Sequence, residues 1–341
     1  MNAKRKRVKK KSYSGKSIYV EVTDACNLQC RSCTSWTKHG NSYMSLETFR
    51  PLLKRIAARG YETMWFYLRG ESYLHPKLPD MMEMAKKRGM RTFCPTSFST
   101  PTLSDETYVT KLLKNITRFG FNLDGYDQES LDKYRVGASW DITMNNFETV
   151  SRLAETIKPP LGINLRVLMF RYNEQHIKFF QDLVENHKGI KGISYIQPTI
   201  LGKNVLTRQE ATEWLAVNPK FQRYMKIDYR RLPKKWLFRG EIVKRTKDHI
   251  WIHKSITRCR SGGPSITVNG EVPCCSQDTD LKHSLGNIFT DTFKTIRINQ
   301  SKIAAKMYYR QLDICKTRCL CRRQKKGASA EQALSQIQPV K

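Results

Sequence analysis

The chain has 341 residues, 39% of them hydrophobic, which is enough to bury one large core or two smaller ones. Its formal net charge is +31, from 61 Lys and Arg against 30 Asp and Glu, and such an excess points to a polyanionic partner. No apolar run approaches the roughly 20 residues of a membrane span, and no apolar segment follows the basic N-terminus as in a secretory signal. We therefore expect a cytoplasmic protein without membrane contact, in which the 10 cysteines are metal ligands or redox groups rather than disulfides.

The N-terminal two thirds of the sequence predict an α/β domain. Residues 1–17 hold eight Lys or Arg and no acid, and are expected to form a flexible basic arm. From residue 18 to 198, short apolar runs alternate with helical patterns, which indicates a parallel sheet with right-handed crossovers. The predicted strands are 18–23, 63–68, 91–96, 118–124, 162–170 and 192–198, and the predicted helices are 45–60, 77–88, 104–117, 127–134, 141–157 and 174–187. Six such units make a partial (β/α)6 TIM-like barrel, in which the loops after the strands gather on one face.

The remainder divides into three predicted segments. Residues 199–258 form a basic linker or substrate-binding segment, because Lys and Arg alternate there with Phe, Tyr and Trp; basic groups can bind phosphates and aromatic rings can stack on bases. The alternative is a basic helical linker whose aromatic residues lie in a core. Residues 259–323 form a small cysteine-rich domain with two short strands around the turn Asn269-Gly270. Residues 324–341 are expected to be a disordered tail.

Three cysteines, Cys26, Cys30 and Cys33, lie within eight residues directly after the first predicted strand. Three thiolates on one loop can bind three irons of a [4Fe–4S] cluster and leave the fourth iron open to a cofactor or substrate. Short cysteine spacings also suit zinc, with a residue such as His39 as the fourth ligand. Spacing alone leaves both alternatives open.

The sequence resembles the radical S-adenosylmethionine (radical SAM) enzymes over roughly residues 18–323. The stretch "CNLQCRSC" matches the CxxxCxxC motif that defines this family. Three further stretches occur in the family's order. They are "YLRGESYLHP" (67–76) after the second strand, "FNLDGYDQESLDKYRVGASWD" (121–141) after the fourth, and "LRVLMFRYNEQHI" (165–177) at the fifth. The zinc alternative becomes a minor one once these matches are counted.

The resemblance implies an enzyme that binds a [4Fe–4S] cluster and S-adenosylmethionine. In this family, one electron from the cluster splits the cofactor, and the resulting 5′-deoxyadenosyl radical abstracts a substrate hydrogen. The match assigns the cluster ligands to Cys26, Cys30 and Cys33, and contact with the methionine amino group to Gly70 and Glu71. It also indicates Asn122 and Arg135 for the methionine carboxylate and ribose, with Ser97 a further ribose contact. An electron donor such as flavodoxin or ferredoxin is implied as a partner.

Three positions depart from the family pattern. Arg69 stands in place of the first glycine of the usual "GGE" triplet, and Ser72 in place of the usual proline. Phe98 interrupts the usual "TNGT" pattern at the third strand. We expect a somewhat different backbone path around Arg69 and Ser72. Asp124 is either a structural residue or a base. Cys94, within the third predicted strand, is expected to be a buried structural thiol.

The C-terminal cysteines resemble the auxiliary-cluster domains called SPASM or twitch. "CRSGGPSITVNGEVPCC" fits the spacing of their first half, but six cysteines stand where the full SPASM form has seven. One auxiliary [4Fe–4S] cluster is therefore favoured over two, and a zinc site is a minor alternative. The ligands implied by the resemblance are Cys259, Cys275 or Cys274, Cys315, and Cys319 or Cys321.

Three functions are compatible with these observations. The net charge, the basic arm and the basic–aromatic segment favour a radical SAM enzyme that modifies a nucleic acid, either by DNA base hypermodification or on RNA. The alternative is a SPASM-type peptide or protein maturase, which we rank lower because the predicted barrel begins near residue 18 without a preceding leader-recognition domain. A non-catalytic iron–sulfur protein that binds nucleic acid would need the cysteines but no segment around Glu71.

Overall fold

The computed structural model of the chain describes residues 17–31, 33, 40–157, 162–196, 214, 216–218, 244–245, 250–251, 264–275, 278 and 280–308. Its main feature is a seven-stranded sheet in the order β6-β5-β4-β3-β2-β1-β9, in which every neighbouring pair is parallel. The strands are β1 (Ser17–Val20), β2 (Thr63–Trp65), β3 (Arg91–Thr96), β4 (Arg118–Asn122), β5 (Gly162–Leu168), β6 (Ile190–Ile196) and β9 (Ser265–Ile266). The predicted alternation of six strands with helices in a parallel α/β sheet is confirmed.

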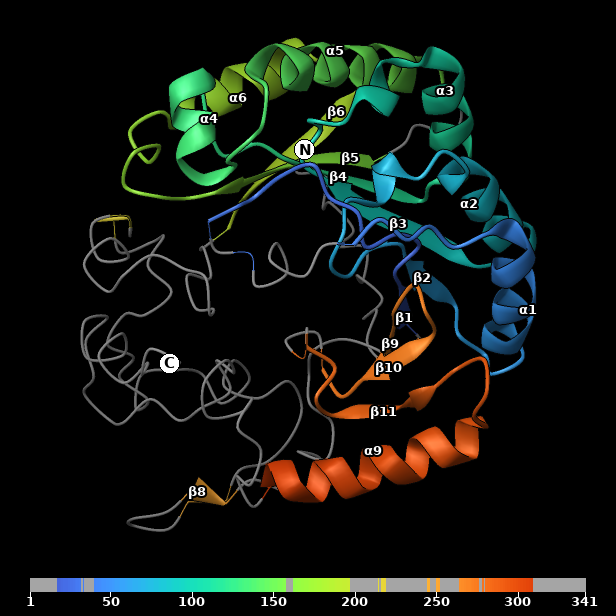
Figure 1. Cartoon of the computed structure of the whole chain (residues 1–341). Coiled ribbons are helices and arrows are strands. Elements are labelled where there is room, and N and C mark those ends of the chain that lie inside the picture. Colours follow the sequence, from blue (N-terminus) through green and yellow to red (C-terminus); the bar gives the residue numbers. More distant parts are fainter. Residues whose placement is uncertain are drawn as a thin grey trace, which may run out of the picture.

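Helices cover the outer face of this sheet (Figure 1). They are α1 (Leu46–Ala57), α2 (Leu78–Lys87), α3 (Glu106–Asn115), α4 (Gln128–Tyr134), α5 (Trp140–Thr156) and α6 (Ile177–Asn186), with short 3-10 turns η2 (Ser72–Leu74) and η3 (Pro101–Ser104). Each of the six predicted helical segments overlaps an observed helix, with ends that agree within three residues, as the apolar periodicity predicts. In a parallel α/β sheet of this kind, the loops that follow the strands meet at one edge.

Helix α1 shows how the sequence specifies these elements. The side chain of Ser45 accepts a hydrogen bond from the amide of Thr48 and so caps the helix, as predicted. The apolar residues follow the helical period, and they are buried against the sheet. These residues are Phe49, Leu52, Leu53 and Ile56. Burial of this apolar stripe, more than intrinsic propensity, holds the helix in place.

The two short strands predicted around residues 269–270 are present, but they belong to different sheets. The turn at Asn269-Gly270 is present, and Gly270 has φ +83°, which few other residues adopt easily. However, β9, before the turn, joins the main sheet beside β1, whereas β10 (Glu271–Pro273), after the turn, pairs antiparallel with β11 (Ser284–Asn287). The turn therefore carries the chain from one sheet to another, which turn chemistry alone does not reveal.

A long helix, α9 (Phe293–Tyr308), lies against β11 beyond this second sheet (Figure 1). Arg55 of α1 donates hydrogen bonds to the backbone carbonyls of Ile288 and Asp291, the latter at 2.7 Å. The guanidinium of Arg59 lies over the ring of Phe293 at 4.7 Å from the ring centroid. These contacts attach the described part of the C-terminal segment to the barrel through α1.

A short antiparallel pair, β7 (Lys244–Arg245) with β8 (Ile250–Trp251), is described within the predicted basic segment. Apart from residues 214 and 216–218, the rest of that segment lies outside the described residues, as do nearly all of the N-terminal arm and the chain after residue 308. The predicted boundaries at 17, 198, 258 and 323 therefore stay predictions. Within the described part of the chain, no helix is both long and apolar enough to cross a lipid bilayer.

Candidate active site

The three cysteines lie in the loop that leaves β1 at the carboxyl edge of the sheet. Cys26, Cys30 and Cys33 are all partly exposed and free of disulfides. The amide of Cys33 donates to the carbonyl of Cys30 at 2.9 Å, so the loop turns tightly between these two thiols. The residues of this loop that the structure describes form neither helix nor strand, so their backbone groups must find partners in neighbouring segments.

Hydrogen bonds attach this loop to segments that follow β2, β3 and β4. The bonds are Glu71 N to Ala25 O at 2.8 Å, Asn27 Nδ2 to Ser99 O at 2.6 Å, and Gln29 N to Val136 O and Arg31 N to Tyr134 O, both at 2.9 Å. Three separate loops at the carboxyl edge thus position the cysteines. The sequence places these segments on one face of the barrel, but it does not reveal which backbone groups pair.

Gly70 is needed for the closest of these approaches. A Cβ atom at this position would lie 2.4 Å from the carbonyl oxygen of Thr23 and 2.6 Å from that of Ala25. Both atoms belong to the backbone, and they cannot move aside as a flexible side chain could. The glycine therefore lets the segment after β2 lie directly against the entry to the cysteine loop.

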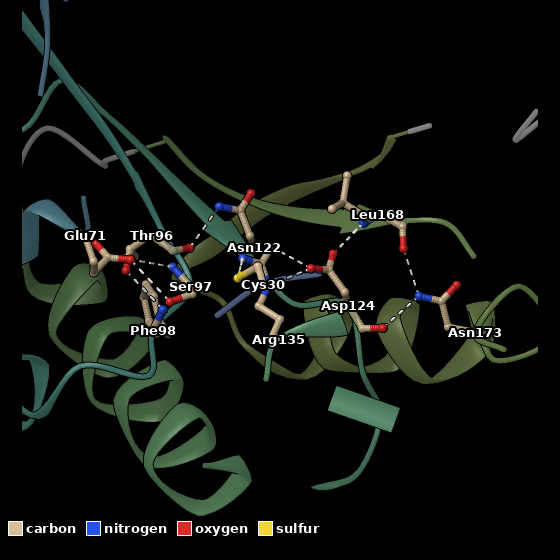
Figure 2. A network of polar contacts seen from close by, with 10 residues as sticks. All are labelled: Cys30, Glu71, Thr96, Ser97, Phe98, Asn122, Asp124, Arg135, Leu168 and Asn173. Atoms are coloured by element: carbon tan, nitrogen blue, oxygen red, sulfur yellow. Dashed lines mark hydrogen bonds and ion pairs between the residues drawn. The ribbon is translucent and has the colours of Figure 1, made fainter. Parts of the chain in front are cut away.

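Glu71 follows Gly70 and points its carboxylate toward the end of β3 (Figure 2). Its Oε2 accepts hydrogen bonds at 3.2 Å from both the amide and the hydroxyl of Ser97, and its Oε1 accepts from the amide of Tyr73 at 3.3 Å. The side chain is buried. Burial raises the pKa of Glu71, against the effect of these hydrogen bonds. A buried carboxylate of this kind is well suited to bind a cationic group such as an ammonium.

A second polar cluster lies on the other side of Cys30 (Figure 2). Arg135, which directly follows α4, donates from Nε and Nη2 to Oδ2 of Asp124 at 2.7 and 2.5 Å, and its Nη1 lies 3.7 Å from Sγ of Cys30. Burial opposes the positive charge of Arg135, but the charges of Asp124 and Cys30 outweigh it and raise the pKa of Arg135. The guanidinium therefore stays charged next to a predicted cluster ligand.

Asp124 itself is fully buried and engaged on every side. Its Oδ1 accepts from the amide of Leu168 at 2.7 Å, and its carbonyl accepts from Nδ2 of Asn173 at 2.8 Å. Of the two interpretations left open from the sequence, these contacts support the structural one, because both carboxylate oxygens are already bonded, Oδ2 to Arg135 and Oδ1 to the amide of Leu168. Asn173 also stabilises the loop after β5, because its Oδ1 accepts a hydrogen bond from the amide of Phe170 at 2.8 Å.

The remaining predicted residues lie between these clusters. Asn122 ends β4 and donates from Nδ2 to the carbonyl of Thr96 at 3.1 Å, which connects it to the Ser97 side of the site (Figure 2). Phe98 has φ +65°, a region that disfavours side chains, and its buried ring packs on Phe119 and Phe121. At Phe98, packing of the ring in the core therefore holds the backbone in a strained conformation.

Arg69, another of the three departures from the family pattern, forms an ion pair with Glu21. Its Nε and Nη2 donate to the two carboxylate oxygens of Glu21 at 2.9 and 2.7 Å, and its amide donates to Oε1 at 3.0 Å. Oε2 of Glu21 also accepts from the amide of Val268 at 3.0 Å. Arg69 therefore helps to join the segment after β2 to the C-terminal segment after β9. Glu21 was not predicted as part of this site, because an acid within a predicted strand gives no signal of this pairing.

The thiols are chemically consistent with ligands of a metal cluster. Burial raises the pKa of Cys26 to about 12 and that of Cys30 to about 11, with the charge of Glu71 adding to the effect at Cys26. Thiolates in this position need positive charge nearby, which bound iron supplies. In the described ranges, no three Cys, His, Asp or Glu side chains are close enough to hold a single metal ion. His39, the fourth ligand of the zinc alternative, lies outside the described residues.

The predicted auxiliary ligands are described only in part. Cys275 is buried, Cys274 is partly exposed, and both follow β10. The carbonyl of Cys275 accepts from the amide of Asp278 at 3.0 Å. Cys259, Cys315, Cys319 and Cys321 lie outside the described residues, so the auxiliary ligand set stays a prediction.

Comparison with known proteins agrees with this geometry. The family model described as the radical SAM superfamily matches residues 20–184, the region that contains the three cysteines and both polar clusters. Residues 20–184 form a radical SAM domain. A curated relative, GTP 3′,8-cyclase of Chlorobaculum tepidum, is 26% identical over 187 residues, which are 53% of this chain and 53% of that protein. The chain thus matches about half the length of this relative.

Solved structures share the fold of the radical SAM domain and of much of the chain. One is described as native anSMEcpe with bound AdoMet and Kp18Cys peptide, with TM-score 0.55, 17% identity, and coverage of 92% of this chain and 89% of that one. Another is SuiB of Streptococcus suis, with TM-score 0.60, 12% identity, and coverage of 89% and 68%. Identities this low establish the fold only.

The residues present fit the cofactors that this family implies, a [4Fe–4S] cluster and S-adenosylmethionine. Three thiols on one loop match the ligand set of a cluster with one open iron. The buried carboxylate of Glu71 suits an ammonium, and the charged guanidinium of Arg135 suits a carboxylate or the negative charge of the thiolates. The backbone contact at Gly70 brings the Glu71 segment against the cysteine loop.

Proposed function

We propose that the chain is a radical SAM enzyme that cleaves S-adenosylmethionine and abstracts a hydrogen from a nucleic acid or nucleotide substrate. The observation that carries the catalytic part is the packing of the Gly70–Glu71 segment onto the cysteine loop, with Glu71 N bonded to Ala25 O at 2.8 Å. This contact places a buried carboxylate next to the predicted cluster ligands. The bound cofactors supply the radical chemistry.

In this proposal each residue has a distinct role. Cys26, Cys30 and Cys33 hold the cluster, Glu71 binds the methionine ammonium, and Asn122 and Arg135 hold the carboxylate and ribose side of the cofactor. Gly70 and Ser97 position Glu71, and Ser97 is also in place to contact the ribose. Asp124 keeps Arg135 charged and oriented.

Charge supports the nucleic-acid part of the proposal. The formal net charge of the sequence is +31, and polyanion binding is the usual reason for such an excess of positive charge. A curated relative is named GTP 3′,8-cyclase, so a nucleotide substrate occurs among similar proteins. Location in the cytoplasm and an electron donor such as flavodoxin or ferredoxin belong to the same proposal.

One auxiliary [4Fe–4S] cluster in the segment 259–323 is also proposed. Its support is the cysteine pattern together with fold similarity to anSMEcpe and SuiB over most of the chain. Iron and sulfide analysis of the reconstituted protein tests it, with about eight irons per chain expected for two four-iron clusters. About four irons per chain would show that there is no auxiliary cluster, and about twelve would show that there are two.

The substrate class is tested with reconstituted protein, dithionite and S-adenosylmethionine. Phage-type DNA, tRNA and a cysteine-containing peptide are supplied in separate reactions, and products are followed by mass spectrometry. Modified nucleosides are expected with DNA or tRNA. Polynucleotide affinity should also fall steeply between low and moderate salt. A modified peptide with unchanged nucleic acids would favour the maturase alternative, for which the support is the peptide bound in the anSMEcpe structure.

A further inference from the structure

The inner face of the barrel carries an arginine that the proposed chemistry does not use. Along β5, Ile163, Leu165 and Val167 are buried on one face, and the alternate residues are only partly buried. Because successive side chains of a strand point to opposite faces, Arg166 lies on the face opposite to these apolar residues. The helices cover the apolar face (Figure 1), so Arg166 faces the lumen.

Room for this side chain comes from a glycine on the next strand. A Cβ at Gly120 of β4 would lie 3.3 Å from Cδ and 3.8 Å from Nη1 of Arg166, and 3.7 Å from Cβ of Pro95 on β3. The arginine therefore extends sideways across β4 toward β3. Gly120 is not among the residues with positive φ, so its lack of a side chain, rather than its backbone freedom, matters here.

The surroundings of Arg166 are polar. Asn122 is its register partner on β4, and Asn164 donates from Nδ2 to the hydroxyl of Ser194 at 3.0 Å on the same face of the sheet. Tyr67, beyond the end of β2, is close enough for the charge of Arg166 to act on its hydroxyl. These groups can supply hydrogen bonds to a polar ligand but carry no negative charge.

The positive charge of Arg166 is not neutralised locally. Among the described residues, no carboxylate oxygen lies within 4.0 Å of a guanidinium nitrogen of Arg166, the distance that defines an ion pair. The acid that acts on it electrostatically is Asp124, whose oxygens are already bonded to Arg135 and to the amide of Leu168. Arg118 and Arg135 add further positive charge. A partly buried guanidinium in a net positive environment is costly unless an anion binds it.

We infer that Arg166 binds a phosphate group of a nucleotide substrate inside the barrel. The inference rests on the proposed nucleotide or nucleic-acid function and adds the group by which such a substrate is held. A guanidinium forms bidentate hydrogen bonds with phosphate, and the net charge of +31 favours phosphate over the carboxylates of a peptide. The site is distinct from Arg135, which contacts Asp124 and Cys30.

Binding to the reconstituted protein with S-adenosylmethionine present tests the inference. The four nucleoside 5′-monophosphates and the matching nucleosides are titrated separately, together with a short acidic peptide. For at least one base, the wild type should bind the monophosphate about tenfold or more tighter than the nucleoside. Arg166→Met should abolish this difference and Arg166→Lys should keep part of it. Arg118→Met, which removes an exposed arginine of the neighbouring strand that acts on Arg166 only through its charge, should reduce it far less than Arg166→Met does.

A second variant tests the position of the side chain without removing its charge. Gly120→Ala should displace Arg166 from its path across β4 and weaken monophosphate binding several-fold, with little effect on nucleoside binding. S-adenosylmethionine affinity should stay unchanged in Arg166→Met and in Gly120→Ala. A loss of cofactor affinity in Arg166→Met would instead assign Arg166 to the cofactor and overturn the inference.

The remaining outcomes separate this site from the proposed function. The inference is overturned if no base shows a preference for its monophosphate, if Arg118→Met has the same effect as Arg166→Met, or if only the acidic peptide responds to Arg166→Met. The proposed function is judged independently, by 5′-deoxyadenosine formed from S-adenosylmethionine without substrate. Wild-type protein that forms this product but shows unchanged binding in Arg166→Met would remove the phosphate site alone.

Discussion

Arg135 binds Asp124 through two nitrogens, at 2.7 and 2.5 Å, while its third nitrogen lies 3.7 Å from the sulfur of Cys30. The side chain of Asp124 is fully buried and that of Arg135 is 11% exposed. The pair therefore holds a positive charge against the cysteine loop in a place where that charge would otherwise be disfavoured. It also links the loop after β4 to the amide of Leu168 at the end of β5.

Replacing Asp124 with Asn should destabilise the protein strongly. The variant keeps an acceptor for the Leu168 amide but leaves the buried guanidinium of Arg135 without a counter-charge, at a cost of about 3 kcal/mol. Denaturant titration measures the free energy of unfolding. The matched control is Glu106→Gln, which breaks the exposed ion pair with Arg152 and should cost well under about 1 kcal/mol. Equal losses in the two variants would show that the Asp124 pair has no special role.

Replacing Gly70 with Ala should impair iron binding more than it impairs folding. The added Cβ would overlap the carbonyl oxygens of Thr23 and Ala25, at 2.4 and 2.6 Å, and push the Glu71 segment and the cysteine loop apart. Iron per chain after reconstitution should fall well below that of the wild type. Gly162→Ala is the control, since no described atom lies within 4 Å of its Cβ position. Full iron content in Gly70→Ala would refute the close packing.

At Phe98, replacement by glycine should destabilise the protein less than replacement by alanine, the reverse of the usual order. Both substitutions remove a buried ring, at about 3–5 kcal/mol, but φ of +65° favours glycine over alanine by about 1 kcal/mol. Phe98→Gly should therefore be more stable than Phe98→Ala in denaturant titrations. At Phe119, a buried position within β4, alanine should be the more stable replacement. The same order at both positions would contradict the strained conformation of Phe98.

His75 should make the protein less stable as the pH falls below about 6.5. Its Nε2 lies 2.9 Å from the carbonyl of Met44, and its Nδ1 accepts from the amide of Lys77 at 3.0 Å. Burial lowers the pKa of His75, so the unfolded chain binds a proton at a pH where the folded chain does not. The free energy of unfolding contributed by this group is therefore fully present above the unfolded pKa and lost as the pH falls through the folded one.

The measurement compares the free energy of unfolding at pH 7 and pH 5.5 for the wild type and for His75→Gln. The wild type should lose up to about 1 kcal/mol per pH unit more than the variant. Parallel pH profiles would show that His75 does not remain neutral on folding. Both ring nitrogens of His75 thus have a hydrogen-bond partner in the fold.

The local patterns of the sequence predicted most of the barrel. Ser45 and the apolar stripe after it define α1, and the cysteine motif falls directly after β1 as expected. Pairings between distant segments could not be predicted. Glu21 binds both Arg69 and the amide of Val268, and β9 joins β1 rather than a hairpin partner. Such contacts depend on the three-dimensional path of the chain, which hydrophobic periodicity and turn residues do not predict.

Within the site, residue types were predicted more easily than their relationships. The motif identified Glu71, Asn122 and Arg135, but only the structure shows that Glu71 accepts from Ser97 and that Arg135 reaches both Asp124 and Cys30. Arg166 was not predicted as a site residue, because an arginine in a β-strand has no sequence signal. Its significance comes from Gly120 beside it and from the lack of an acid partner in the described part of the barrel.

The most direct test of the proposed activity is the formation of 5′-deoxyadenosine from S-adenosylmethionine by anaerobically reconstituted protein with dithionite. The wild type should form it, and Cys30→Ala should form none and lose about four irons per chain. Glu71→Gln should keep the iron of the wild type but need much more S-adenosylmethionine, since an amide attracts an ammonium less than a carboxylate does. Wild-type protein with a full iron complement that forms no 5′-deoxyadenosine, with or without nucleic acid, would contradict the central claim.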